Sequence, residues 1–148
     1  MPLKELLAEG RLRPHKSSRR EIRDLLQVAD RDLKDAAVKA ISIDLRFQTA
    51  YQAALRLATI VLASSGYRAI GQGHHWATFN VLPELLGREF QEIADYLDHC
   101  RGKRNLSDYD RAGEISEGEA VELLGEARKL REVVLGWLRR NHPALAPR

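Results

Sequence analysis

The feature that most constrains the fold of this chain is a spacing of apolar residues by three and four positions, repeated in several segments. Such spacing places the apolar side chains on one face of an α-helix, whereas a β-strand requires sustained alternation, which the chain lacks. Three of these stripes are Ile22, Leu25, Leu26, Ala29 and Leu33; Phe47, Ala50, Tyr51, Ala54 and Ala58; and Ala120, Leu123, Ala127, Leu130 and Val134. The sequence therefore predicts an all-α domain.

Capping residues predict where the main helices begin. Ser18 with Glu21 and Ser116 with Glu119 match the capping box, and the helix that follows Ser42 carries a broad apolar stripe typical of a central helix. A further main helix is expected from about residue 88. Because each stripe needs cover, we expect an antiparallel up-and-down bundle of four main helices with additional short helices, and a homodimer that buries the remaining apolar surface.

Shorter segments connect these helices. Residues 1–17 are expected to form a short helix followed by a basic connector that contains Pro14. Residues 67–73 and 108–115 are expected to be loops, and the helix that begins near His74 must kink or restart near Pro83. In the last helix two glycines suggest close packing against a neighbouring helix. The whole chain, 1–148, is expected to be a single domain.

Composition excludes several classes of protein. The chain has 44% hydrophobic and 30% charged residues, and its central apolar run, 60–63 (IVLA), is far shorter than the roughly 18 residues of a membrane span. The start of the sequence lacks the pattern of a secretion signal. One cysteine, Cys100, cannot form an internal disulfide. We therefore expect a cytoplasmic protein that does not contact a membrane.

An arginine stands where the next apolar residue of a helical stripe is expected. The stripe consists of Phe90, Ile93, Ala94, Leu97 and Cys100, and its next member is Arg104. A cation facing a core is costly unless it is paired or bound to an anion. Asn105, Asp108, Tyr109 and Asp110 follow. One interpretation is an anion or nucleotide site; the other is that Arg104 caps its helix and pairs with Asp108 or Asp110.

A second cluster that could carry chemistry is Gly73-His74-His75-Trp76. The positive end of the helix dipole disfavours the charged form of an imidazole at a helix start, and a neutral imidazole can accept a proton from a substrate near neutral pH. The alternative is that one histidine caps the helix and Trp76 packs in the core. We expect no metal and no cofactor, because no second histidine lies four residues away on the same helical face and no phosphate-binding loop is present. The basic stretches at residues 11–23 and 101–104 permit phosphate contact, although such stretches are more commonly solvated.

The chain resembles the HEPN (higher eukaryotes and prokaryotes nucleotide-binding) superfamily in residues 101–110 (RGKRNLSDYD), preceded by 50–55 (AYQAAL) and 66–68 (GYR). The likeness extends from about residue 18 to residue 143. It implies an antiparallel helical bundle, commonly a homodimer in which arginine-bearing turns meet. Many members of the family are ribonuclease toxins paired with a small nucleotidyltransferase antitoxin, and others bind nucleotides or serve in defence systems.

In ribonuclease members of this family the arginine precedes a histidine by a few positions. Arg104 and Asn105 match the motif, whereas the histidine position falls on Tyr109. Tyrosine ordinarily titrates near 10, so Tyr109 is a poor base at neutral pH, although it can donate a hydrogen bond. The resemblance thus assigns the catalytic positions to Arg104, Asn105 and Tyr109. We expect supporting binding residues at Arg101, Lys103, Asp108, His74 and His75.

These observations favour a module that binds a nucleotide or RNA and works with a nucleotidyltransferase partner in a toxin–antitoxin or defence system. A second interpretation is a metal-independent endoribonuclease toxin in which His74 or His75 replaces the missing imidazole. A third is a structural helical adaptor without a ligand, for which Arg104→Met would be neutral or stabilising.

Overall fold

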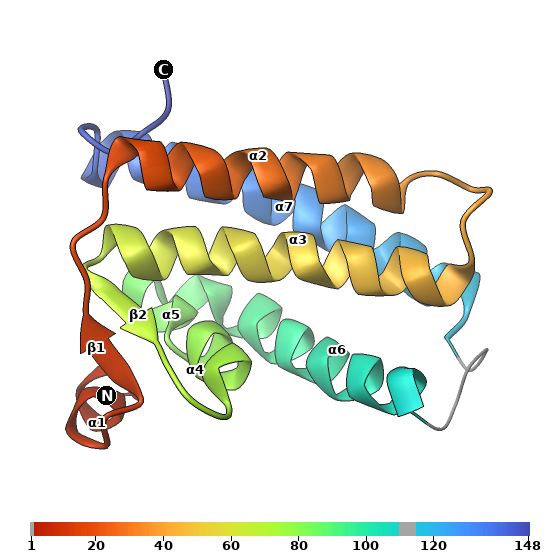
Figure 1. Cartoon of the computed structure of the whole chain (residues 1–148), viewed down its shortest axis with the longest axis horizontal. Helices are drawn as coiled ribbons and strands as arrows, with labels where there is room; N and C mark the ends of the chain where they lie inside the picture. The colour runs from red at the N-terminus through yellow and green to blue at the C-terminus, as the bar shows by residue number, and fades with distance from the viewer. Residues whose placement is uncertain (1, 110–114) are drawn as a thin grey trace.

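The computed structural model describes the backbone of residues 2–109 and 115–148, and the side chains of these residues other than 105–109. Long helices dominate it: α2 (Arg19–Ala36), α3 (Ile43–Ser64), α6 (Gln91–Tyr109) and α7 (Glu117–Asn141). Consecutive members of this set run in opposite directions along one axis (Figure 1). The predicted all-α, antiparallel up-and-down bundle is confirmed.

Helix α3 is the centre of the bundle, as its broad apolar stripe predicted. It packs against α2, α6 and α7, and most of its residues are buried. Ser42 caps its start, because the Ser42 hydroxyl oxygen accepts a hydrogen bond from the Leu45 N–H at 3.3 Å. Phe47 and Tyr51 are among the largest fully buried side chains of the protein. Helix α3 is therefore a closely packed central element on which the other helices rest.

Short elements cover the end of the bundle at which α3 finishes. They are α1 (Pro2–Ala8), β1 (Leu12–Pro14), β2 (Tyr67–Ala69), α4 (His74–Asn80), α5 (Leu82–Leu86) and the 3-10 helix η1 (Arg88–Phe90). The break between α4 and α5 agrees with the interruption predicted at Pro83. A small apolar cluster fixes these elements to α3 and consists of Leu6, Leu12, Leu62, Ala77 and Val81.

The predicted connector around Pro14 and the predicted loop at 67–73 are partly wrong. Strands β1 and β2 form an antiparallel pair in which Leu12 lies opposite Ala69 and Pro14 lies opposite Tyr67. Strands of three residues are too short to show an alternating pattern, and proline is tolerated because this sheet consists only of edge strands. Leu12 is 2% exposed and anchors the pair on the apolar cluster.

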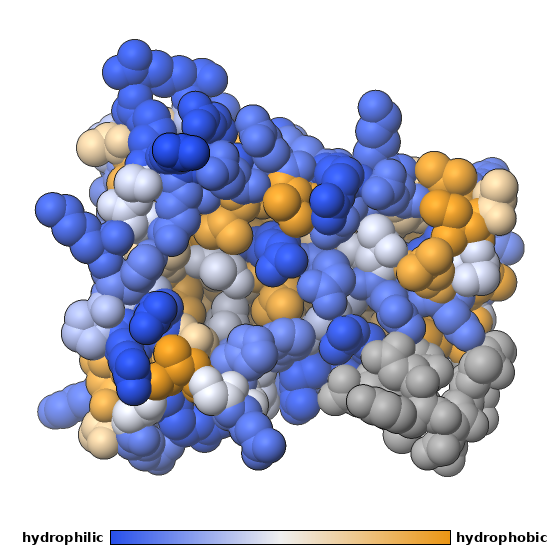
Figure 2. All heavy atoms as spheres, viewed as in Figure 1, coloured by the Kyte–Doolittle hydropathy of each residue, from blue (hydrophilic) through white to orange (hydrophobic). Residues whose placement is uncertain are grey.

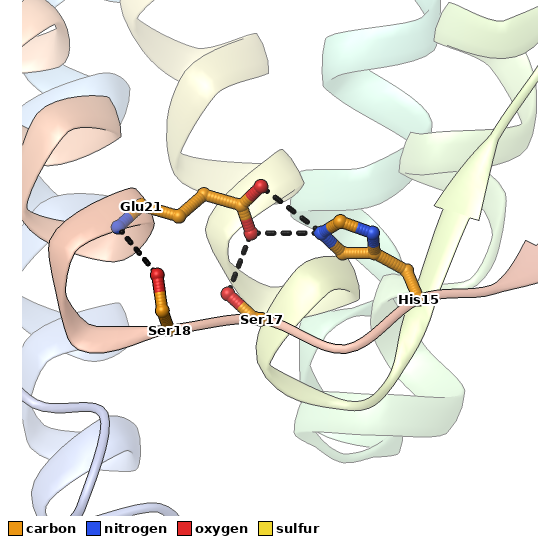
Figure 3. A network of polar contacts seen from close by, with 4 residues as sticks. All are labelled: His15, Ser17, Ser18 and Glu21. Carbon is orange, nitrogen blue, oxygen red and sulfur yellow. Dashed lines mark hydrogen bonds and ion pairs between the residues drawn. The ribbon is translucent and has the colours of Figure 1, made fainter.

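The two predicted capping boxes differ in the structure. At α7 both halves form: Ser116 Oγ accepts from the Glu119 N–H, and Glu119 Oε1 accepts from the Ser116 N–H. At α2 only Ser18 Oγ acts as a cap, accepting from the Glu21 N–H at 3.1 Å. The Glu21 carboxylate instead binds Ser17 and His15, as Figure 3 shows. The sequence pattern therefore predicted the helix start correctly but not the partner of the carboxylate.

Two further expectations need correction. Helix α6 extends to Tyr109, so the loop expected at residues 108–115 is wrong for residues 108 and 109, while residues 110–114 lie outside the described residues. A β-carbon added at Gly125 would meet no atom within 4 Å, and at Gly136 it would meet only the flexible side chain of Arg140. Close packing therefore does not explain the glycines of α7.

The face seen in Figure 1 is mostly hydrophilic (Figure 2), with apolar atoms gathered at the end where α2 gives way to α3. Val38, within this connection, and Leu45, in the first turn of α3, are 43% and 50% exposed. Within the described ranges, no helix combines the length and apolar character needed to cross a bilayer.

Candidate functional site

One pocket brings together the two clusters that the sequence analysis selected. We call it the Arg104 pocket; it has a volume of about 390 Å³ and lies between α6 and the segment that leads into α4. Arg101 and Arg104 line it from α6, and His74, His75 and Trp76 line it from α4. Spacing alone placed the arginines and histidines on separate helices. Contact between α4 and α6 makes them neighbours.

Arg104 lies half-buried against the central helix. Its guanidinium carbon is 5.3 Å from the centre of the Tyr51 ring, a distance at which a cation is attracted to an aromatic face. Helix α6 continues to Tyr109, five residues beyond Arg104, and a capping contact of Arg104 with the last carbonyls of this helix lies outside the described residues. A pairing of Arg104 with Asp108 or Asp110 lies outside the described residues.

Tyr51 joins the arginine to the histidine pair. Its side chain is fully buried, and its hydroxyl lies 3.0 Å from His75 Nδ1. Burial raises the pKa of Tyr51 above its ordinary value, so the phenol keeps its proton at neutral pH. In the sequence, Tyr51 lies on the apolar stripe of the central helix and within the segment 50–55 that resembles the HEPN superfamily, and neither pattern predicts its contacts. Its phenol was the one signal of a polar role, since a buried hydroxyl requires a hydrogen-bond partner.

His75 is a neutral imidazole at physiological pH. Burial lowers the pKa of His75 to about 4, and the neighbouring charges of His74, Arg104 and Arg101 act in the same direction. The protonated phenol of Tyr51 can donate to Nδ1, which places the proton of the neutral ring on Nε2. With a pKa this low, His75 is a weak base near pH 7 but a competent hydrogen-bond donor.

His74 is the more exposed of the two histidines. Its Nδ1 lies 3.1 Å from the Gly71 carbonyl oxygen, and because a carbonyl can only accept, Nδ1 carries a proton. When the ring is neutral, Nε2 therefore keeps its lone pair. The two imidazoles meet edge to face with centroids 4.3 Å apart. Neither histidine caps α4, because the N-cap residue of this helix is Gly73 and no side chain makes a capping hydrogen bond at its start.

The remaining members of the predicted site divide between the two sides of α6. Arg101 lines the pocket while its Nε donates to Asp98 Oδ1 at 2.8 Å. Lys103 points elsewhere and pairs with Glu119 of α7.

Asn105, Asp108 and Tyr109 belong to the backbone of α6, but their side chains lie outside the described residues. In the part of the chain that is described, no group of histidine, cysteine and acidic side chains could hold a metal ion.

Trp76 and Arg11 close the edge of the pocket. Trp76 is half-buried and packs against the small apolar cluster, which partly supports the expectation that it belongs to the core. The Arg11 guanidinium carbon lies 4.7 Å from the centre of the Trp76 ring. A β-carbon at Gly73 would approach Arg11 Nη2 at 2.8 Å, so this glycine allows the arginine to come close. A third cation therefore borders the Arg104 pocket.

The model of the SAV_6107-like HEPN domain matches residues 36–135, a range that contains α3, α4, α5 and α6 and hence all the residues that line the Arg104 pocket. Neither the curated proteins nor the solved structures give a match. The chain belongs to the HEPN superfamily, whose domains are nucleotide- and RNA-related modules.

Proposed function

We propose that this HEPN domain binds a nucleotide or the phosphates of RNA in the Arg104 pocket. The observation that carries the proposal is the convergence of Arg101, Arg104 and two imidazoles, from separate helices, on one open pocket. Arginine presents a planar fork of donors that matches phosphate oxygens. The neutral His75 ring adds an N–H donor without adding a charge. Opposite charges on ligand and pocket make this binding salt-dependent.

Replacement of Arg104 tests the proposal. Arg104→Ala should weaken binding of a fluorescein-labelled single-stranded RNA decamer by about tenfold or more, because a charge-assisted contact contributes about 1.5–3 kcal/mol. Arg139→Ala is the matched control, since Arg139 is an exposed arginine of the last turn of α7 and its loss removes the same charge. Fluorescence anisotropy gives the affinities. Equal affinity of wild type and Arg104→Ala, with the fold intact by circular dichroism, would refute the site.

A metal-independent endoribonuclease is the second candidate, and His74 favours it. Because Nδ1 of His74 donates to Gly71, the neutral ring presents the lone pair of Nε2, which a general base for the 2′-hydroxyl requires. Arg104 would stabilise the negative charge that develops on the phosphate. Under this hypothesis wild type cleaves RNA in the presence of EDTA and His74→Ala does not. RNA that stays uncleaved at saturating concentrations of wild-type protein would reject the endoribonuclease hypothesis and leave the binding function as the proposal.

We further propose that the domain acts in the cytoplasm as a homodimer with a nucleotidyltransferase partner, in a toxin–antitoxin or defence system. Support comes from the family resemblance and from the arginine pocket. Light scattering coupled to size exclusion measures the oligomer, and a monomer at micromolar concentration would contradict the dimer. The adaptor alternative predicts that wild type binds neither RNA nor nucleotide, so the same anisotropy titration decides between the two.

A further inference from the structure

A second pocket lies on the other side of the histidine pair. We call it the Arg56 pocket; it has a volume of about 370 Å³ and is enclosed by α2, α3, β2 and α4. His74 and His75 line both pockets and therefore form a shared wall. Figures 1 and 2 view the molecule from the side on which β2 and α4 lie beside α3, where apolar atoms are set among hydrophilic ones. A volume of this size is within the range of small-ligand sites.

The walls of the Arg56 pocket combine an apolar surface with hydrogen-bonding groups. Leu55 and Leu62 of α3 are 6% and 2% exposed and form its floor. Gln52 and Thr59 lie on the same helix and line the pocket beside them. The Thr59 hydroxyl donates to the Leu55 carbonyl at 2.7 Å, so its oxygen can still accept a hydrogen bond from a ligand. A planar ligand group with hydrogen-bonding atoms along its edges matches this combination of an apolar floor and polar side walls.

The charge of the Arg56 pocket is positive. Arg56 of α3 and Arg68 of β2 line it, and Glu21 is the carboxylate among its described lining residues. Glu21 is already engaged, because it accepts from Ser17 Oγ at 2.6 Å and contacts His15 Nε2 at 2.9 Å (Figure 3). Burial acts to raise the pKa of Glu21, but these hydrogen bonds outweigh it and lower the pKa. Two arginines and one carboxylate thus line the pocket, and the carboxylate is held by its own neighbours.

We propose that the Arg56 pocket holds one unstacked nucleotide, with its base against Leu55 and its phosphate at Arg56 and Arg68. This inference rests on the proposed function, because it makes the Arg104 pocket and the Arg56 pocket neighbouring sites for one ligand chemistry. The nucleotide is either part of an RNA strand held at Arg104 or a free mononucleotide. A base in a duplex remains stacked and paired, so an RNA strand that enters the Arg56 pocket must be single-stranded there.

Blocking the pocket tests the proposal. Thr59→Phe fills the Arg56 pocket, whereas the matched variant Thr59→Ser keeps the hydroxyl and adds no bulk. The probes are a labelled single-stranded RNA decamer, the same decamer with abasic positions, the corresponding duplex, and adenosine and uridine monophosphates. Gln52→Ala, at a half-buried position, provides a second test should the phenylalanine disturb folding.

We expect wild type to bind the single strand about tenfold more tightly than the abasic strand or the duplex, because only a free base can be buried against the apolar floor of the Arg56 pocket. Thr59→Phe should abolish this preference and Thr59→Ser should retain it. If mononucleotides bind to wild type and to Thr59→Ser but not to Thr59→Phe, the free nucleotide is the ligand. If they do not bind while the strand preference holds, the ligand is RNA.

Two outcomes would overturn the inference, and they differ. Unchanged single-strand preference in both Thr59→Phe and Gln52→Ala, together with weaker binding by Arg104→Ala, would remove the Arg56 pocket and leave the Arg104 site in place. Absence of binding to every probe by wild type would remove the proposed function and this inference with it.

Discussion

Titration of His75 makes the stability of this protein depend on pH in a defined direction. In the folded state burial lowers the pKa of His75 to about 4 from its ordinary value of 6.5. Between these two values the unfolded chain binds more protons than the folded chain. The free energy of unfolding therefore rises with pH through this window, and the contribution of His75 is fully present above pH 6.5 and lost as the pH falls towards 4.

The magnitude follows from the difference between the two pKa values. About 1.4 kcal/mol per pKa unit gives an upper limit of about 3.4 kcal/mol. His75 lines two open pockets and is partly exposed, so solvent screening reduces the effect to about 1–2 kcal/mol. His75→Gln is the matched reference, because glutamine does not titrate and its amide oxygen can accept from the Tyr51 hydroxyl.

Urea denaturation of both proteins at pH 7, 5.5 and 4.5 measures this effect, since carboxylates such as Glu21 contribute equally to both. We expect wild type to lose about 1–2 kcal/mol relative to His75→Gln between pH 7 and pH 4.5. A difference between the two proteins that is constant with pH, or that favours wild type as the pH falls, would refute the burial of a neutral His75. The chemical shifts of the His75 ring protons provide the midpoint directly.

Three further predictions concern the bundle that supports the site. Ser116→Ala removes the complete capping box of α7 and should cost about 1 kcal/mol, seen as a fall of about 2–4 °C in Tm; an unchanged Tm would contradict the cap. Arg131→Lys loses the two-pronged contact with Asp30 between α7 and α2, at 2.5 and 3.1 Å. It should cost about 0.5–1 kcal/mol in urea denaturation at low salt and less in 1 M NaCl, whereas a loss insensitive to salt would argue against an ion pair. Arg46→Met should cost about 2 kcal/mol, because the 6% exposed Arg46 donates to the Ala36 carbonyl at the end of α2 and lies near Glu117; equal stability would show that this carbonyl finds another partner.

The main helices of this fold were predictable because a single physical rule governs them. Burial of one helical face imposes the three-and-four spacing, and caps such as Ser42 and Ser116 satisfy N–H groups that have no partner within the helix. The strands at Leu12 and Tyr67 were not predictable. Their pairing depends on the chain returning after two long helices, and three residues carry no periodic signal.

The candidate site was predictable in part. Arg104 was selected because it interrupts an apolar stripe, and Arg101 because it lies nearby in the same basic stretch. Their proximity to His74 and His75 could not be derived, since it depends on the packing of α4 on α6 rather than on spacing within a helix. Lys103 shows the opposite case. It belongs to the same basic stretch, yet helical geometry turns it towards Glu119 of α7 and away from the pocket.

Tyr51 explains how the two halves of the site depend on one another. Its ring lies under the Arg104 guanidinium, and its hydroxyl contacts His75, so both neighbours constrain a single fully buried side chain. An anion that binds Arg104 withdraws part of the positive charge felt by His75, and this favours protonation of the imidazole. Phosphate binding should therefore raise the pKa of His75, and protonation of His75 should strengthen phosphate binding by the same factor. The buried phenol contacts both groups, which an aliphatic residue of the helical core could not do, so Tyr51→Phe should weaken this coupling by removing the hydrogen bond to His75.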